Sequence, residues 1–220
     1  MINENIKQIF NQVPQRVQIV AAGKSRAVGE IKQAIAAGIR IVGENYVQEA
    51  EEKLKVIGKV VQWHFIGHLQ KNKIKRAVKI FDMIQTLDCF ETAQGINQVC
   101  GQENRVMPVL IEVNSAREKE KFGLFPEDAE SLIREIYQFK HIKVVGLMTM
   151  GPNFSNQEEL RPYFRETRQL FERIKSLNLP GVEMRYLSMG MSDSYQIAIQ
   201  ERANLVRIGT AIFGKRRPRH

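Results

Sequence analysis

Short apolar runs, rich in β-branched residues, recur at regular intervals along the whole chain. Most of them are almost continuously apolar rather than alternating, as expected for strands of a parallel sheet that are buried on both faces. The sequence therefore predicts eight buried parallel strands. They lie in the runs 17–23, 39–45, 63–67, 83–87, 107–113, 144–150, 184–190 and 205–214.

The segments between these runs have the apolar spacing of amphipathic helices. In residues 158–177, for example, Leu160, Phe164 and Phe171 recur at roughly helical spacing with charged residues between them. Pro126 suits a helix start, because proline presets φ and the two acidic residues after it face the positive end of the helix dipole. Helices are predicted at 29–37, 47–56, 71–79, 90–99, 126–139 and 158–177, with an additional helix at 3–12 before the first strand.

Eight strands that alternate with helices fit either an open doubly wound sheet or a closed (β/α)8 barrel. No G-x-G-x-x-G turn follows the first run, which argues against a dinucleotide-binding sheet. The length of 220 residues suits a barrel, and no linker rich in Pro, Gly or Ser divides the chain. We therefore predict one α/β domain, a (β/α)8 TIM barrel with an extra N-terminal helix, over residues 1–214, and a basic tail at 215–220.

The composition narrows the class of protein. Hydrophobic residues make up 43% and charged residues 26%, which excludes a mainly disordered chain. No apolar run reaches the length of a membrane span, and the polar N-terminus does not resemble a signal peptide. Two cysteines, Cys89 and Cys100, form neither a disulfide framework nor a metal site. We expect a cytoplasmic protein with reduced thiols and no membrane partner.

The net charge of +9 raises the question of nucleic-acid binding. Four of the positive charges lie in the tail 215–220, and the other basic cluster, at 71–79, has the spacing of a solvated helix face. No stripe of alternating aromatic and basic residues accompanies them. We therefore expect no specific nucleic-acid partner, although a basic chain favours small anions such as phosphorylated ligands.

Lys24 is the most informative polar residue, because it directly follows the first apolar run. Functional residues of barrels cluster where the strands end. Burial at such a position lowers the pKa of a lysine, and a neutral amine attacks an aldehyde to form a Schiff base. The alternative is an ordinary strand-end lysine whose ammonium group reaches water.

The seventh and eighth strands end in segments that suit a phosphate group, the usual place for one in such barrels. Ser188–Ser192 supplies hydroxyl and backbone N–H groups near a helix start, and Arg207–Thr210 supplies a cation, a glycine and a hydroxyl. Alternatively, Ser192 only caps a helix and Arg207 forms a salt bridge inside the barrel. A reactive lysine and a phosphate cradle at one barrel opening describe a site for pyridoxal 5′-phosphate (PLP).

Four long motifs resemble those of the pyridoxal phosphate homeostasis protein family: VGENYVQE (42–49), WHFIGHLQKNK (63–73), LSMGMSDS (187–194) and VRIGTAIFG (206–214). The resemblance implies a fold-type III PLP barrel, similar to the N-terminal domain of alanine racemase without its second domain. It implies that PLP is bound covalently to Lys24 as a Schiff base. It also implies phosphate contacts from Ser192, Gly209 and Thr210, a place near the site for Asn45 and Ser188, and an Arg207 that faces the pyridine nitrogen.

The resemblance further implies a binding protein for intracellular PLP homeostasis without catalytic residues. The alternative is a small PLP-dependent racemase or decarboxylase in which His64 or Lys24 acts as the base. We expect PLP as the ligand, apo forms of PLP-dependent enzymes as candidate recipients, and a monomer. One departure is evident, since the family commonly has Ser or Thr before the lysine and Thr after it, whereas this chain has Gly23 and Ser25.

Overall fold

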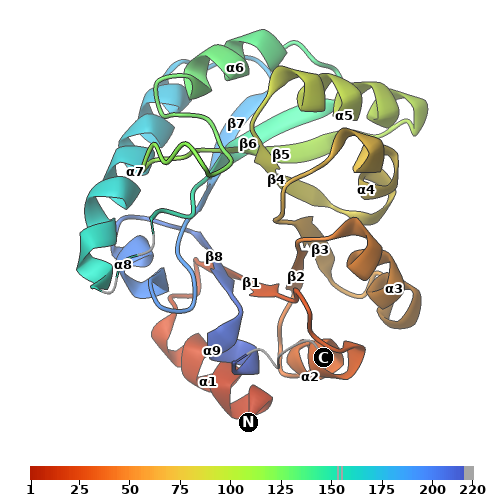
Figure 1. The fold of residues 1–220 in the computed structure, drawn as a ribbon, viewed down its shortest axis with the longest axis vertical. Helices are drawn as coiled ribbons and strands as arrows, with labels where there is room; N and C mark the ends of the chain where they lie inside the picture. The colour runs from red at the N-terminus through yellow and green to blue at the C-terminus, as the bar shows by residue number, and fades with distance from the viewer. Residues whose placement is uncertain (153, 155, 216–220) are drawn as a thin grey trace.

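The computed structural model describes residues 1–152, 154 and 156–215. Eight parallel strands form one closed barrel in chain order, and a ring of helices surrounds it (Figure 1). The predicted (β/α)8 barrel is therefore confirmed. The strands are β1 (Gln18–Ala22), β2 (Ile41–Glu44), β3 (Gln62–Phe65), β4 (Met83–Leu87), β5 (Met107–Glu112), β6 (Ile142–Met148), β7 (Val182–Ser188) and β8 (Leu205–Ile208).

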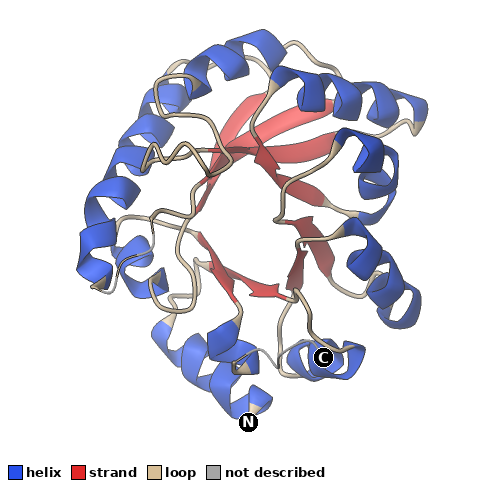
Figure 2. Cartoon of the chain, in the orientation of Figure 1, coloured by secondary structure: helices blue, strands red, loops and turns tan. Residues whose placement is uncertain are grey.

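The helices lie outside the strands on all sides (Figure 2). They are α1 (Ile2–Gln12), α2 (Val28–Ala36), α3 (Val47–Ile57), α4 (Ile74–Ile80), α5 (Phe90–Gln102), α6 (Ala129–Ile136), α7 (Arg161–Ser176), α8 (Tyr195–Gln200) and α9 (Thr210–Phe213). The predicted extra helix α1 packs against α2 and α9, and Asn5 Nδ2 donates a hydrogen bond of 2.9 Å to Ile212 O. Within the described ranges, no helix is both long and apolar enough to cross a membrane.

Two separate apolar cores explain why the strand runs are apolar almost throughout. The larger core fills the space between the strands and the helices. A smaller one fills the inside of the barrel with Val20, Ile41, Met83, Leu110, Val145, Met148 and Leu205. Because successive side chains of a strand point to opposite faces, one strand can supply both cores: β1 places Val20 in the inner core and Ile19 and Ala21 in the outer one.

A layer of buried polar side chains lies above this inner core, towards the carboxyl ends of the strands. Gln85, Glu112 and Arg207 each follow an inner-core residue by two positions and therefore share its inward direction. His64 and Ser188 are buried in the same layer, because both are hydrogen-bonded into it. This layer is the floor of the opening where candidate residues were predicted.

Several element boundaries differ from the sequence-based prediction by two residues or more. The eighth run was predicted as one strand over 205–214, but β8 ends at Ile208 and the chain turns at Gly209 into α9. The side chain of Ser192 accepts the N–H groups of Gly209 and Ala211, so these groups do not extend the strand ladder. The helix predicted at 126–139 begins only at Ala129, after a turn at 126–128. Apart from Lys215, the predicted tail lies outside the described residues.

Candidate cofactor site

A cavity of about 370 Å³ opens at the carboxyl end of the barrel. Lys24 after β1, Asn45 after β2, Thr86 in β4 and Glu112 in β5 line it. Lys24 is half-buried, and its Nζ lies 5.2 Å from the centre of the Tyr46 ring. The side chain thus borders the cavity beside an aromatic ring that favours a cation.

The loops after β7 and β8 lie at the same end of the barrel, but Ser192, Gly209 and Thr210 do not line this cavity. Ser192 Oγ accepts hydrogen bonds from the backbone N–H groups of Gly209 (3.0 Å) and Ala211 (3.1 Å). Two N–H groups that converge on one oxygen are the donor set that a phosphate oxygen requires. Thr210 lies exposed between them as the first residue of α9. The two backbone donors and the hydroxyls of Ser192 and Thr210 fit a phosphate group, which would share the N–H groups of Gly209 and Ala211 with Ser192 Oγ.

Gly190 shapes the same segment. Its φ of +87° lies in the left-handed region, and an added Cβ would lie 2.6 Å from Ala198 Cβ and 2.8 Å from Tyr195 Cα. The loop after β7 can therefore pack onto α8 only with glycine at this position. This close packing carries Ser192 to the start of α9.

Arg207 is buried in the floor of the opening and holds a chain of hydrogen bonds. Its guanidinium donates to Ser188 Oγ at 2.6 Å and to Thr149 O at 2.8 Å. Since a guanidinium can only donate, the Ser188 hydroxyl donates onward to Gln85 Oε1 at 2.7 Å. The amide nitrogen of Gln85 then donates to His64 Nδ1 at 2.9 Å, so His64 is neutral with its proton on Nε2.

The salt bridge considered for Arg207 is therefore not what holds it. Among the described residues its hydrogen-bond partners are a hydroxyl and a carbonyl, and no carboxylate lies within 4 Å. Burial lowers the pKa of Arg207 to about 10, while the charge of Glu112 opposes that shift. The guanidinium thus remains protonated at neutral pH.

Glu112 is a site residue that sequence reasoning missed. It is buried, lines the cavity and lies in the electrostatic reach of Arg207 and Asp88. Burial, and after it the charge of Asp88, raise the pKa of Glu112, whereas Arg207 lowers it, and the net result is a pKa of about 7. Glu112 ends an apolar run, and the local sequence does not show which residues of other strands it will face. Sequence reasoning therefore had no basis for selecting it.

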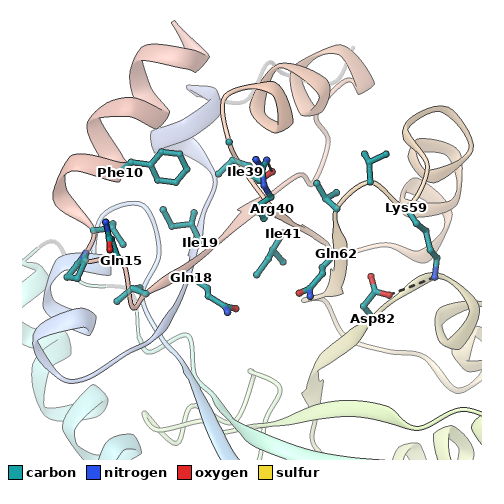
Figure 3. Close-up of a pocket in the computed structure, with 16 residues that line it drawn as sticks. Phe10, Gln15, Gln18, Ile19, Ile39, Arg40, Ile41, Lys59, Gln62 and Asp82 are labelled. Atoms are coloured by element: carbon teal, nitrogen blue, oxygen red, sulfur yellow. Dashed lines mark hydrogen bonds and ion pairs between the residues drawn. The ribbon is translucent and has the colours of Figure 1, made fainter.

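A larger cavity, of about 1040 Å³, lies at the opposite end of the barrel (Figure 3). Phe10 of α1 and apolar residues at the starts of β1 and β2, such as Ile19 and Ile41, line it. Its charged pair, Lys59 and Asp82, is 3.9 Å apart and partly exposed. Because the amino end of a barrel usually serves stability rather than chemistry, we place the functional site at the smaller cavity.

Comparison with known proteins identifies the family. The sequence model described as "Alanine racemase, N-terminal domain" matches residues 1–217. The pyridoxal phosphate homeostasis protein of Aquifex aeolicus is 37% identical over 201 residues, which cover 91% of this chain and 87% of that protein. The chain belongs to the pyridoxal phosphate homeostasis proteins. The predicted family is thereby confirmed.

Solved structures agree with this assignment. PipY from Synechococcus elongatus, solved with PLP bound, has a TM-score of 0.90 and 30% identity, covering 97% of this chain and 100% of that chain. An alanine racemase from Clostridium difficile in complex with cycloserine has a TM-score of 0.82 at 16% identity, covering 99% of this chain and 60% of that chain. The racemase shows only that the barrel fold is shared.

Glu44 lies directly beside Gly23, the position at which the pyridoxal phosphate homeostasis proteins commonly have Ser or Thr. A Cβ at Gly23 would lie 2.4 Å from Oε1 of Glu44, which is buried. A serine or threonine before Lys24 would therefore require the side chain of Glu44 to shift.

The buried His64 gives a testable pH dependence of stability. Burial lowers the pKa of His64 to about 3, whereas an unfolded histidine titrates near about 6.5. The unfolded chain therefore binds more protons below pH 6.5, and His64 costs about 2 kcal/mol of stability by pH 5. The variant His64→Gln keeps an acceptor for Gln85 but cannot be protonated. Between pH 7.5 and pH 5, we expect its free energy of unfolding, measured with urea, to fall by about 2 kcal/mol less than that of the wild type.

The exposed His68 supplies the control for this experiment. Between pH 7.5 and pH 5, the free energy of unfolding of His68→Gln is expected to fall by as much as that of the wild type. Burial raises the pKa values of Glu44 and Glu112, so these two residues increase the free energy of unfolding as the pH falls. Their effect is the same in all three proteins. An acid loss of the same size in His64→Gln and in the wild type would contradict a neutral, buried His64.

Proposed function

We propose that this protein binds PLP covalently through Lys24 and serves intracellular PLP homeostasis. One observation carries the proposal: Lys24 lines a cavity at the same barrel end at which the N–H groups of Gly209 and Ala211 converge. When bound, PLP supplies a phosphate and an aldehyde whose condensation with a neutral amine forms a C=N bond and releases water. The name of the Aquifex aeolicus relative and the PLP bound to PipY support the same ligand.

The roles of the other residues follow from their positions. Ser192, Gly209 and Thr210 would hold the phosphate, and Asn45 lies beside Lys24 in the cavity wall. Arg207, fixed through Ser188 in the floor, would face the pyridine nitrogen. Because a protonated guanidinium can only donate, a ring nitrogen facing it accepts a hydrogen bond and stays unprotonated.

We propose binding without catalysis, and the state of His64 supports this choice over a racemase or decarboxylase. Its Nδ1 already accepts from Gln85 and its Nε2 carries the proton, so this histidine has no free lone pair to act as a base. Incubating the PLP-loaded protein with single amino acids in deuterated water would test the alternative. Rapid exchange of the Cα hydrogen with turnover would favour the enzyme.

Borohydride trapping tests the proposed function directly. The protein is incubated with PLP, reduced with borohydride and digested, and the peptide carrying the pyridoxyl group is identified by mass spectrometry. We expect one modified peptide that contains Lys24. A pyridoxyl group found mainly on another lysine, or no adduct, would refute the proposal.

Replacement of Ser192 tests the phosphate part of the site. We expect Ser192→Ala to weaken PLP retention about ten-fold, because a hydrogen bond to a charged group is lost. Pyridoxal, which lacks the phosphate, provides the control: its reaction with Lys24 is expected to be the same in the variant and in the wild type. Equilibrium dialysis measures the first and borohydride trapping the second. An equal loss for both ligands would argue against a phosphate contact.

The setting of the protein is also part of the proposal. Neither Cys89 nor the buried Cys100 forms a disulfide, which suits a reducing compartment, and we place the protein in the cytoplasm. We propose that one barrel, residues 1–214, acts as a monomer and passes PLP to apo forms of PLP-dependent enzymes. Light scattering of the purified protein tests the monomer.

A further inference from the structure

A cluster of charged side chains surrounds the peptide groups on either side of Lys24. On one side, Lys53 Nζ donates hydrogen bonds to the backbone oxygen of Gly23 at 2.7 Å and to Glu44 Oε1 at 2.6 Å. On the other side, the backbone N–H of Ser25 donates to Glu49 Oε2 at 2.9 Å. The two sides are joined, since Lys53 Nζ lies 3.6 Å from the same Glu49 oxygen.

The three charged side chains come from two consecutive elements, β2 and α3. Glu44 ends β2, whereas Glu49 and Lys53 lie one turn apart on α3. None of the three lines the cavity, and their contacts are to the backbone beside Lys24 and to one another. Ser25, which Glu49 contacts, has a φ of +61°, a conformation that an L-residue adopts only where its surroundings hold it.

Stability alone does not account for this cluster. Lys53 is 6% exposed and Glu44 is fully buried, and the second carboxylate oxygen of Glu44 has no hydrogen-bond partner in the described part of the chain. Taking two such charges out of water often costs as much as their attraction returns, and apolar replacements of a buried pair are frequently tolerated. A cluster of this kind is better explained by what it holds in place than by the free energy of unfolding.

We propose that Lys53, together with Glu44 and Glu49, positions Lys24 by fixing the two peptide groups that flank it, so that its amine projects into the cavity. The proposal rests on the proposed function, because it assigns Lys53 a role in the covalent bonding of PLP to Lys24. Lys53 is a positioning residue in this scheme. A backbone that is free to turn at Gly23 would spread the Lys24 amine over many positions, and a displacement of even 1 Å slows a bond-forming step strongly.

The test separates positioning of the amine from binding of the ligand. We compare the rate of borohydride-trapped PLP incorporation at Lys24 with the affinity for 4′-deoxypyridoxine 5′-phosphate, which has the ring and phosphate but no aldehyde. For Lys53→Met we expect incorporation to slow by about ten-fold or more while the affinity for the analogue changes less than about two-fold. Lys55→Met, at an exposed position of the same helix, is the matched control and is expected to behave as the wild type.

Removing Lys53 alone leaves Glu44 buried without a cation, and this variant can fail to fold. The double variant Glu44→Gln/Lys53→Met removes both charges of the buried pair. Glu49→Gln leaves that pair in place and weakens the contacts of this side chain to Ser25 and Lys53. Each of these variants is expected to slow incorporation without loss of affinity for the analogue. Lys53→Arg, which keeps the positive charge, is expected to incorporate PLP faster than Lys53→Met. Equal losses of rate and analogue affinity in the double variant, or a wild-type rate in it, would overturn the positioning role. Failure of the wild type to form the Lys24 adduct would instead refute the proposed function.

Discussion

Replacing Lys24 by alanine is expected to lower PLP incorporation at least about 100-fold, because no other amine is held at the same place in the cavity. The barrel should stay folded. Lys24 is half-buried, and its recorded contact with the Tyr46 ring contributes only about 0.5–1 kcal/mol at such a site. Borohydride trapping with peptide mapping measures the adduct, and urea unfolding measures the stability.

Two variants sharpen this result. Lys24→Arg keeps the positive charge but has no amine that forms the bond, so it is expected to lose the adduct as fully as alanine does. Lys73→Ala removes the other lysine that lines the cavity and is expected to keep the adduct on Lys24. An adduct that survives in Lys24→Ala and disappears in Lys73→Ala would move the covalent site to Lys73.

The second large effect is expected at Gly146, where β6 and β7 shift register. Its φ is +151°, and an added Cβ would lie 1.8 Å from the backbone oxygen of Tyr186. The strand pairing of the barrel would have to open, so we expect Gly146→Ala to cost at least about 3 kcal/mol or to prevent folding. The site should suffer as well, since β6 leads directly to Thr149, whose carbonyl accepts from Arg207.

Gly29 provides the control for this experiment, because a Cβ there meets nothing within 4 Å. It lies in the first turn of α2, where alanine suits the backbone, and Gly29→Ala is expected to be neutral or to add up to about 0.5 kcal/mol. Urea unfolding of both variants measures the difference. Similar stabilities for Gly146→Ala and Gly29→Ala would contradict the close approach of β6 to β7.

Much of the fold could be predicted from the sequence, because a buried face of a strand or helix produces a pattern of apolar residues in the local sequence. The continuous apolar runs predicted every strand of the barrel, and the N-terminal helix was predicted within a residue of its start. The end of β8 was wrong, because it depends on Ser192, which lies 17 residues before Gly209 and is brought to it only by the packed loop. Local pattern reports which face of an element is buried, but not which distant side chain will reach its backbone.

The site divides in the same way. The sequence alone determined that Lys24 ends a buried strand, that a serine-rich segment and an arginine with a glycine end two later strands, and hence that the three meet at one barrel opening. Only the tertiary structure decided that Lys53 and Glu49 contact the peptide groups beside Lys24. It also decided that Glu112 faces the opening. The hydrogen bonds that link Arg207 through Ser188 and Gln85 to His64 likewise became visible only there. These partners come from different strands and helices, and their distances are set by closure and register of the barrel rather than by any neighbour in the chain.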